Sequence, residues 1–140
     1  MPKRISNPIG GVIGRRGTTV LFHSITIGAS GAITTQDTAL ASGIVAVKTA
    51  AKTGRYTLTL PSTYRNFLFG MAMIIGPDDV NYGANTTGLA AIFRDNDIDG
   101  NATSAKDGTI EVQFVQGTYA DAEVPSGFIV KLRLDVEVGV

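Results

Sequence analysis

The sequence predicts an all-β protein, an antiparallel β-sandwich or barrel of about seven strands with an extended N-terminal arm. Apolar and polar residues alternate with a period of two over several short segments, and no segment has a convincing helical period. Turn signals separate these segments. Glycine, a frequent turn residue, accounts for 17 of the 140 residues, which exceeds its average usage of about 7%. A chain of this length suits one body, so we divide it into a flexible basic arm, residues 1–17, and a β-rich body, residues 18–140.

The first predicted strand is Thr18–Gly28. Every second residue from Leu21 to Ile27 lies on one face, and this apolar row includes His23, while Val20 points to the opposite face. We therefore expect the only histidine of the chain to be a structural or interface residue rather than a catalytic base.

A hairpin is predicted next, with strands Gly43–Ala50 and Arg55–Leu60 joined by a turn that ends at Gly54. Pro61 ends the second strand because it has no amide hydrogen to donate. The alternation in this strand predicts one buried face and one face in contact with water.

The segment Phe67–Ile75 is apolar on both faces. A strand with no polar side has to be covered twice. We therefore expect one of its rows to form an oligomer interface, made by Phe67, Phe69, Met71 and Met73.

Three more strands are predicted in the C-terminal half. Leu89–Arg94 is a short candidate, and Thr109–Gln116 alternates between inward apolar and outward polar residues. The last strand has the clearest alternation, with apolar residues from Val130 to Val138 and charged residues between them. A row of alternating charges on a strand is typical of a face that contacts solvent or another subunit.

The charged residues of the arm are all basic. The arm contains four of the twelve basic residues and no acidic one, so the body has eight basic and twelve acidic residues and a formal charge of −4. Fully extended, 17 residues reach about 55 Å, beyond the diameter of a domain of this size. We expect the arm to bind a neighbouring protein through its basic and apolar residues, which are Lys3, Arg4, Ile5, Ile9, Val12, Ile13, Arg15 and Arg16.

Composition excludes several kinds of chemistry. The absence of cysteine excludes disulfides and thiolate metal sites, and no phosphate-binding, dinucleotide-binding or zinc motif is present. No motif of these kinds indicates an enzymatic activity or a small-molecule substrate. A net charge of zero makes nucleic acid an unlikely partner, and no apolar segment is long enough for a membrane helix.

One motif suggests a metal. Asp95, Asp97 and Asp99, followed by Gly100, match the first half of a calcium-binding EF-hand loop. The second half differs, because Lys106 occupies the position where a bidentate glutamate is required. Two readings stay open: a weak Ca²⁺ site, or a solvent-exposed turn without metal.

The order of four segments resembles small virion proteins of tailed bacteriophages, in particular capsid decoration or cement proteins. These segments are Gly54–Leu60, Phe67–Ile75, Asp107–Phe114 and Pro125–Val136. The resemblance covers residues 54–140. It implies a β-rich body on the outside of the phage head, made in the host cytoplasm, often a homotrimer, whose arm or loops clamp adjacent subunits of the major capsid protein.

We therefore expect a non-enzymatic virion structural protein that stabilises the head by bridging capsid subunits. The low charge content, 17% against a usual 25% or so, agrees with a surface that contacts other chains. The alternative is a Ca²⁺-assisted binding or adhesion module of a phage fibre or baseplate, which would use the aspartates Asp95 to Asp99.

Overall fold

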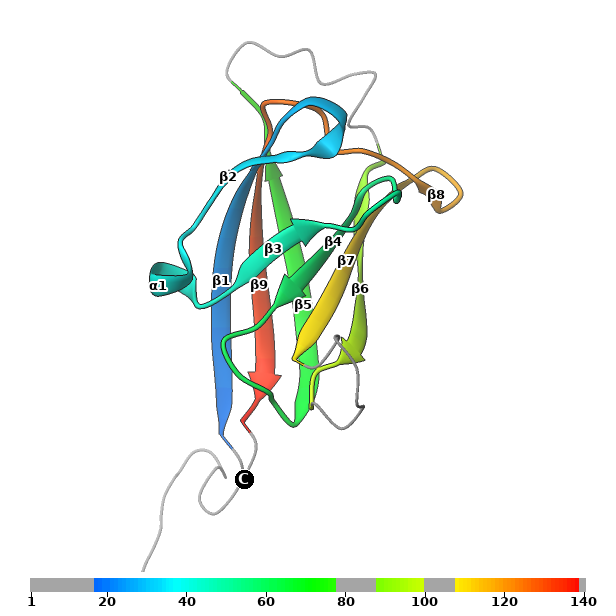
Figure 1. Ribbon diagram of the computed structural model, residues 1–140. Coiled ribbons are helices and arrows are strands. Elements are labelled where there is room, and N and C mark those ends of the chain that lie inside the picture. Colours follow the sequence, from blue (N-terminus) through cyan, green and yellow to red (C-terminus); the bar gives the residue numbers. More distant parts are fainter. Residues whose placement is uncertain (1–16, 78–87, 100–107, 139–140) are drawn as a thin grey trace, which may run out of the picture.

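The protein is an antiparallel β-sandwich in the computed structural model, which describes residues 17–77, 88–99 and 108–138 (Figure 1). The first sheet has the strand order β2 (Ile33–Gln36), β1 (Thr18–Ile27), β9 (Ile129–Glu137), β5 (Asn66–Ile75). The second has the order β3 (Val45–Lys48), β4 (Arg55–Thr59), β7 (Thr109–Gln116), β6 (Ala90–Asp97), with β8 (Ala120–Asp121) beside β7. Two short helical turns, η1 (Ala29–Gly31) and α1 (Ala39–Ser42), flank β2.

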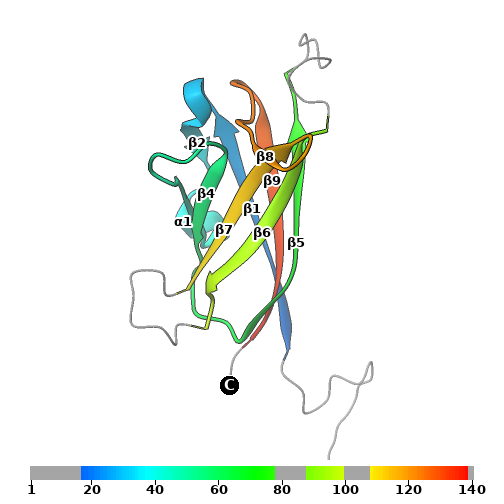
Figure 2. The same ribbon diagram turned by 90° about the vertical axis from the view of Figure 1, so that its right-hand side faces the viewer.

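The core lies between the two sheets, which form separate layers (Figure 2). Alternation places the apolar row of each strand inward. In the first sheet, β9 contributes four residues that are buried almost completely, and β1 contributes three. In the second sheet, the ring of Tyr56 packs edge-on against that of Phe114, with their centroids 6.0 Å apart. The inward-facing buried apolar residues of β1, β4, β7 and β9 are Leu21, Ile25, Ile27, Tyr56, Leu58, Ile110, Val112, Phe114, Val130, Leu132, Leu134 and Val136.

All seven predicted strands are present, and the fold class is confirmed as a sandwich rather than a barrel. The structure adds two short strands that the sequence did not predict, β2 and β8. Both lack a clear alternation of buried and exposed residues, since β2 is at a sheet edge and β8 has only two residues.

The prediction that Phe67 shares a face with Phe69 is wrong. Phe67 pairs with Val136 and Phe69 with Asp135, so Leu68 is an extra residue in a β-bulge. An extra residue moves the next side chain to the opposite face of the sheet. Phe67 therefore points inward, where its ring lies 5.9 Å from that of Phe93, and Phe69 points outward.

Gly70 allows the two sheets to meet at the edge formed by β5 and β6. A Cβ atom at Gly70 would lie 2.6 Å from Cγ of Phe93 and 2.8 Å from Cζ of Phe67. Because such distances are far below van der Waals contact, only glycine lets both rings pack against β5 here.

Candidate partner-binding surface

The outward side of β1, β9 and β5, which we call the open face, contains most of the exposed large apolar side chains of the first sheet. The strand pairing brings these residues together: Phe22 and Met71 both pair with Arg133, and Val20 and Phe69 both pair with Asp135. Directly opposite residues of antiparallel strands point to the same face. The six apolar residues, each between 40% and 62% exposed, are Val20, Phe22, Phe69, Met71, Met73 and Ile75. Two exposed apolar strips on one face of a sheet, with β9 between them, mark an interaction site.

A single row of charged residues runs along β9 through the middle of the open face. The row reads Lys131, Arg133, Asp135, Glu137, two positive charges followed by two negative ones. Arg133 donates two hydrogen bonds to Asp135, of 2.9 and 3.2 Å, and these bonds raise the pKa of its guanidinium. Its charge also lies 6.0 Å from the centre of the Phe69 ring, within the range of a cation–π contact. Arg133 is therefore held flat against the open face.

Three of the four residues predicted as an oligomer interface lie on the open face: Phe69, Met71 and Met73. Phe67 does not, because of the bulge. The sequence prediction missed Phe22 and Val20, although their row opposite His23 was visible. Nothing in the sequence alone pairs β1 and β5 with the same strand, and only that pairing joins the two rows into one surface.

The arm begins at this sheet. The carbonyl oxygen of Gly17, the first described residue, accepts a hydrogen bond of 2.9 Å from the backbone N–H of Val138, next to β9. The predicted binding residues of the arm lie outside the described residues; they are Lys3, Arg4, Ile5, Ile9, Val12, Ile13, Arg15 and Arg16.

His23 is buried and has a hydrogen-bond partner on each ring nitrogen. Its Nε2 lies 2.9 Å from Oε1 of Gln36, and its Nδ1 lies 2.7 Å from Oγ of Ser42. An amide oxygen only accepts, so Nε2 carries a proton and donates it to Gln36. With 2% of its surface exposed, the ring is out of reach of a substrate, and its contacts are those of a structural residue.

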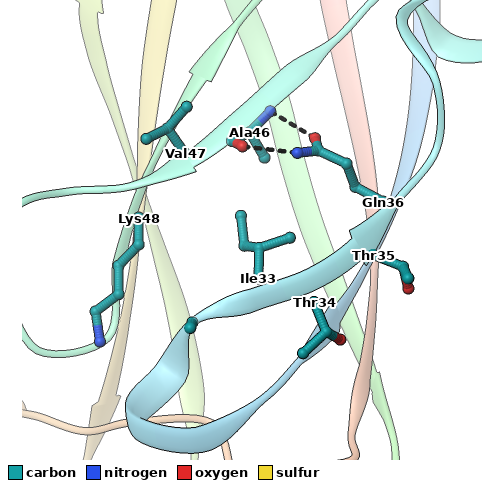
Figure 3. A pocket seen from close by; sticks show the side chains of 8 residues that line it. Ile33, Thr34, Thr35, Gln36, Ala46, Val47 and Lys48 are labelled. Atoms are coloured by element: carbon teal, nitrogen blue, oxygen red, sulfur yellow. Dashed lines mark hydrogen bonds between the residues drawn. The ribbon is translucent and has the colours of Figure 1, made fainter.

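A groove of about 440 Å³ separates β2 from β3, the strands at one edge of each sheet. The side chain of Gln36 closes one end of it by pairing with the backbone of Ala46 (Figure 3). The groove is lined by Ala32, Ile33, Thr34, Thr35, Gln36, Ala46, Val47 and Lys48. It is shallow and mixed in polarity, with no convergent set of chemically active groups.

A buried polar cluster fixes the turn before β2 to the second sheet. Oε1 of Glu123 accepts hydrogen bonds from Nζ of Lys48 at 2.7 Å and from the N–H of Gly54 at 3.1 Å. The Tyr56 hydroxyl donates to the carbonyl of Gly31 at 2.7 Å. Burial, and secondarily the charge of Glu123, raise the pKa of Tyr56 well above its ordinary value. These contacts are structural and leave Tyr56 protonated.

Two of the three aspartates of the predicted calcium motif lie in a strand, and the third follows it. Asp95 and Asp97 belong to β6, and the turn after them is anchored by buried Ile98. Oδ1 of Asp95 accepts a hydrogen bond of 2.9 Å from the N–H of Ile98. Within residues 17–77, 88–99 and 108–138, no group of three His, Asp or Glu side chains is placed to hold a metal ion.

Comparisons with protein-family models, with curated proteins and with solved structures found no significant match. Neither helical turn of the described chain has the length and apolar character needed to cross a bilayer.

Proposed function

We propose that the protein is a non-enzymatic virion structural protein that decorates the outside of a phage head and stabilises it by bridging adjacent major capsid subunits. The observation that carries the proposal is the open face. Six large apolar side chains in contact with water on one sheet are costly for a protein that acts alone, at roughly 25 cal/mol for each Å² of apolar surface. Contact with another polypeptide removes that cost.

The arm gives the body a second point of attachment. It leaves the body beside β9, so it starts from the same sheet as the open face. Two linked attachments bind more tightly than either alone, because the second becomes intramolecular once the first has formed. Four basic residues suit an acidic partner surface, and the arm's apolar residues Ile5, Ile9, Val12 and Ile13 would offset the entropy lost on ordering, about 1 to 2 kcal/mol per residue.

A non-enzymatic role also agrees with how the chain uses its groups. The one histidine serves the β1–β2–β3 contact, and the partly buried carboxylate of Glu123 links Lys48 of β3 to the β3–β4 turn at Gly54. The pattern resemblance to phage decoration proteins, over residues 54–140, supports the head as the place of attachment.

Immunogold labelling of purified particles of the tailed phage that encodes the chain tests this function. We expect label over the heads. Label confined to the tail tip or fibres would overturn the head role and favour the adhesion alternative, and unlabelled particles from cells that express the protein would overturn a virion role altogether.

A further inference from the structure

We infer that the open face binds the open face of a second copy of this chain, stacked antiparallel about a two-fold axis that runs across the strands. The inference deepens the proposed function and rests on it in one respect, since it takes the open face to be a contact surface. It names the occupant of that face. The paired copies then attach to the head through two arms, so loss of the pair weakens head binding.

The charge order along β9 carries the inference. Lys131 and Arg133 are positive, and Asp135 and Glu137 are negative. A two-fold axis at the level of Leu134 places Arg133 of one copy over Asp135 of the other, twice. It likewise places Lys131 over Glu137. All four charges of each copy then face an opposite charge, as an isologous interface requires.

Four of the six apolar residues of the open face match under the same operation, whereas Met73 falls opposite the polar Asn66. The pairing gives one row of Phe22, Arg133 and Met71 and the next of Val20, Asp135 and Phe69. Stacking one row on the other sets Phe22 on Val20 and Met71 on Phe69. Each pair places a larger side chain against an apolar neighbour, so the central charges are enclosed between two apolar strips.

The other face-to-face arrangement fails on charge. A two-fold axis parallel to the strands would place Arg133 over Arg133 and Asp135 over Asp135. Like charges opposite one another are destabilising. A three-fold arrangement gives no such matching of one face with itself, so the charge order favours a pair over the trimer that the phage resemblance implies.

The area of the open face limits the affinity of the dimer. Three strands of nine or ten residues cover roughly 14 Å by 30 Å of flat sheet. Counted on both copies this is about 840 Å², below the roughly 1,200 Å² of ordinary specific interfaces and in the range of weak, transient contacts. We therefore expect a reversible dimer that forms at micromolar concentration and dissociates on dilution.

Sedimentation velocity on the full chain and two charge-reversal variants tests the pairing. Arg133→Glu and Asp135→Lys each place like charges opposite one another in the homodimer, so each should be monomeric where the unaltered chain has twice the mass of a monomer. Mixed in equal amounts they regain matched charges, so a heterodimer should form. Lys52→Glu, an exposed charge reversal in the β3–β4 turn, is the matched control and should dimerise normally.

Three results would overturn the inference: a strict monomer or a trimer for the unaltered chain, single variants that dimerise as well as the unaltered chain, or a mixture that stays monomeric. Thermal unfolding of each variant checks that its fold is intact. Binding to phage heads is measured separately. If monomeric variants still bind heads, the pairing can fail without contradicting the proposed function. If the unaltered chain dimerises but never binds heads, the pairing is supported and the proposed function is contradicted.

Discussion

The side chain of Gln36 pairs with the backbone of Ala46 in both directions. Nε2 of Gln36 donates to the Ala46 carbonyl at 3.0 Å, and the Ala46 N–H donates to Oε1 at 2.8 Å. These are the two bonds that a neighbouring strand would make. Gln36 thereby links the edge of the first sheet to the edge of the second, and through His23 it ties this edge to β1.

Replacing Gln36 by alanine should lower the free energy of unfolding by about 2 to 3 kcal/mol, because three polar groups lose their partner and two of them belong to the backbone of buried Ala46. Chemical denaturation measures this. Thr35→Ala, at the exposed adjacent position, should cost under about 0.5 kcal/mol. Equal losses in the two variants would contradict the role given to the Gln36 amide.

Stability should fall at alkaline pH because of Tyr56. Its pKa is raised in the folded protein by burial and by Glu123, while in the unfolded chain it stays near 10.0. Above pH 10 the unfolded chain loses the proton that the folded state retains, so the free energy of unfolding falls by up to about 1.4 kcal/mol per pH unit. Below pH 10 the Tyr56 hydroxyl is protonated in both the folded and the unfolded state, so its contribution to the free energy of unfolding does not change with pH.

Tyr56→Phe should flatten this alkaline decline, at a cost of about 1 kcal/mol at neutral pH for the lost bond to Gly31. Tyr119→Phe, at a tyrosine that is 77% exposed, serves as the control and should keep the decline. Denaturation midpoints from pH 8 to pH 11 give the comparison. A decline that survives in Tyr56→Phe would show that another group causes it.

Gly70→Ala should destabilise the protein by about 1 to 3 kcal/mol, because the added methyl group meets the rigid rings of Phe93 and Phe67. In the double variant with Phe93→Leu the two effects should be less than additive, since the smaller side chain makes room for the methyl. Gly17→Ala, which has no heavy atom within 4 Å of the new carbon, is the control. Strict additivity would contradict the close packing at this edge.

A titration with Ca²⁺ distinguishes the proposed head-decoration function from the alternative of a Ca²⁺-assisted adhesion module. Asp95 already caps the turn at Ile98, so we expect titration calorimetry to give no saturable heat with Ca²⁺. Asp97→Ala should then change nothing in the titration. A saturable heat in the unaltered chain that this variant abolishes would establish a calcium site at the end of β6.

Much of the fold was predictable because the alternation on β1, β4 and β9 has a single buried face. Where both faces are apolar, as on β5, a period of two cannot locate a bulge, and Phe67 was assigned to the wrong side. Short β2 gave no pattern, because its position depends on Gln36 contacting a strand ten residues away.

The open face illustrates what a single sequence leaves out. Each of its rows could be read from the sequence as every second residue, one on β1 and one on β5. Their union depends on both strands pairing with β9, a contact between residues more than fifty positions apart. The order of charges on β9 could be read from the sequence. It suggests a contact with a second copy only because apolar rows flank it on the same face.

The most direct measurement of the central claim, that the open face and the arm together bind other polypeptides in the virion, is add-back binding to heads assembled without the protein. We expect at least a tenfold weaker apparent affinity for a chain that starts at Thr18 and for the double variant Phe22→Gln with Met71→Gln, a loss of about 1.4 kcal/mol or more. Val45→Gln with Ile92→Gln, on the outer side of the second sheet, should bind as the unaltered chain does. Undiminished affinity in both the shortened chain and the open-face variant would contradict the account.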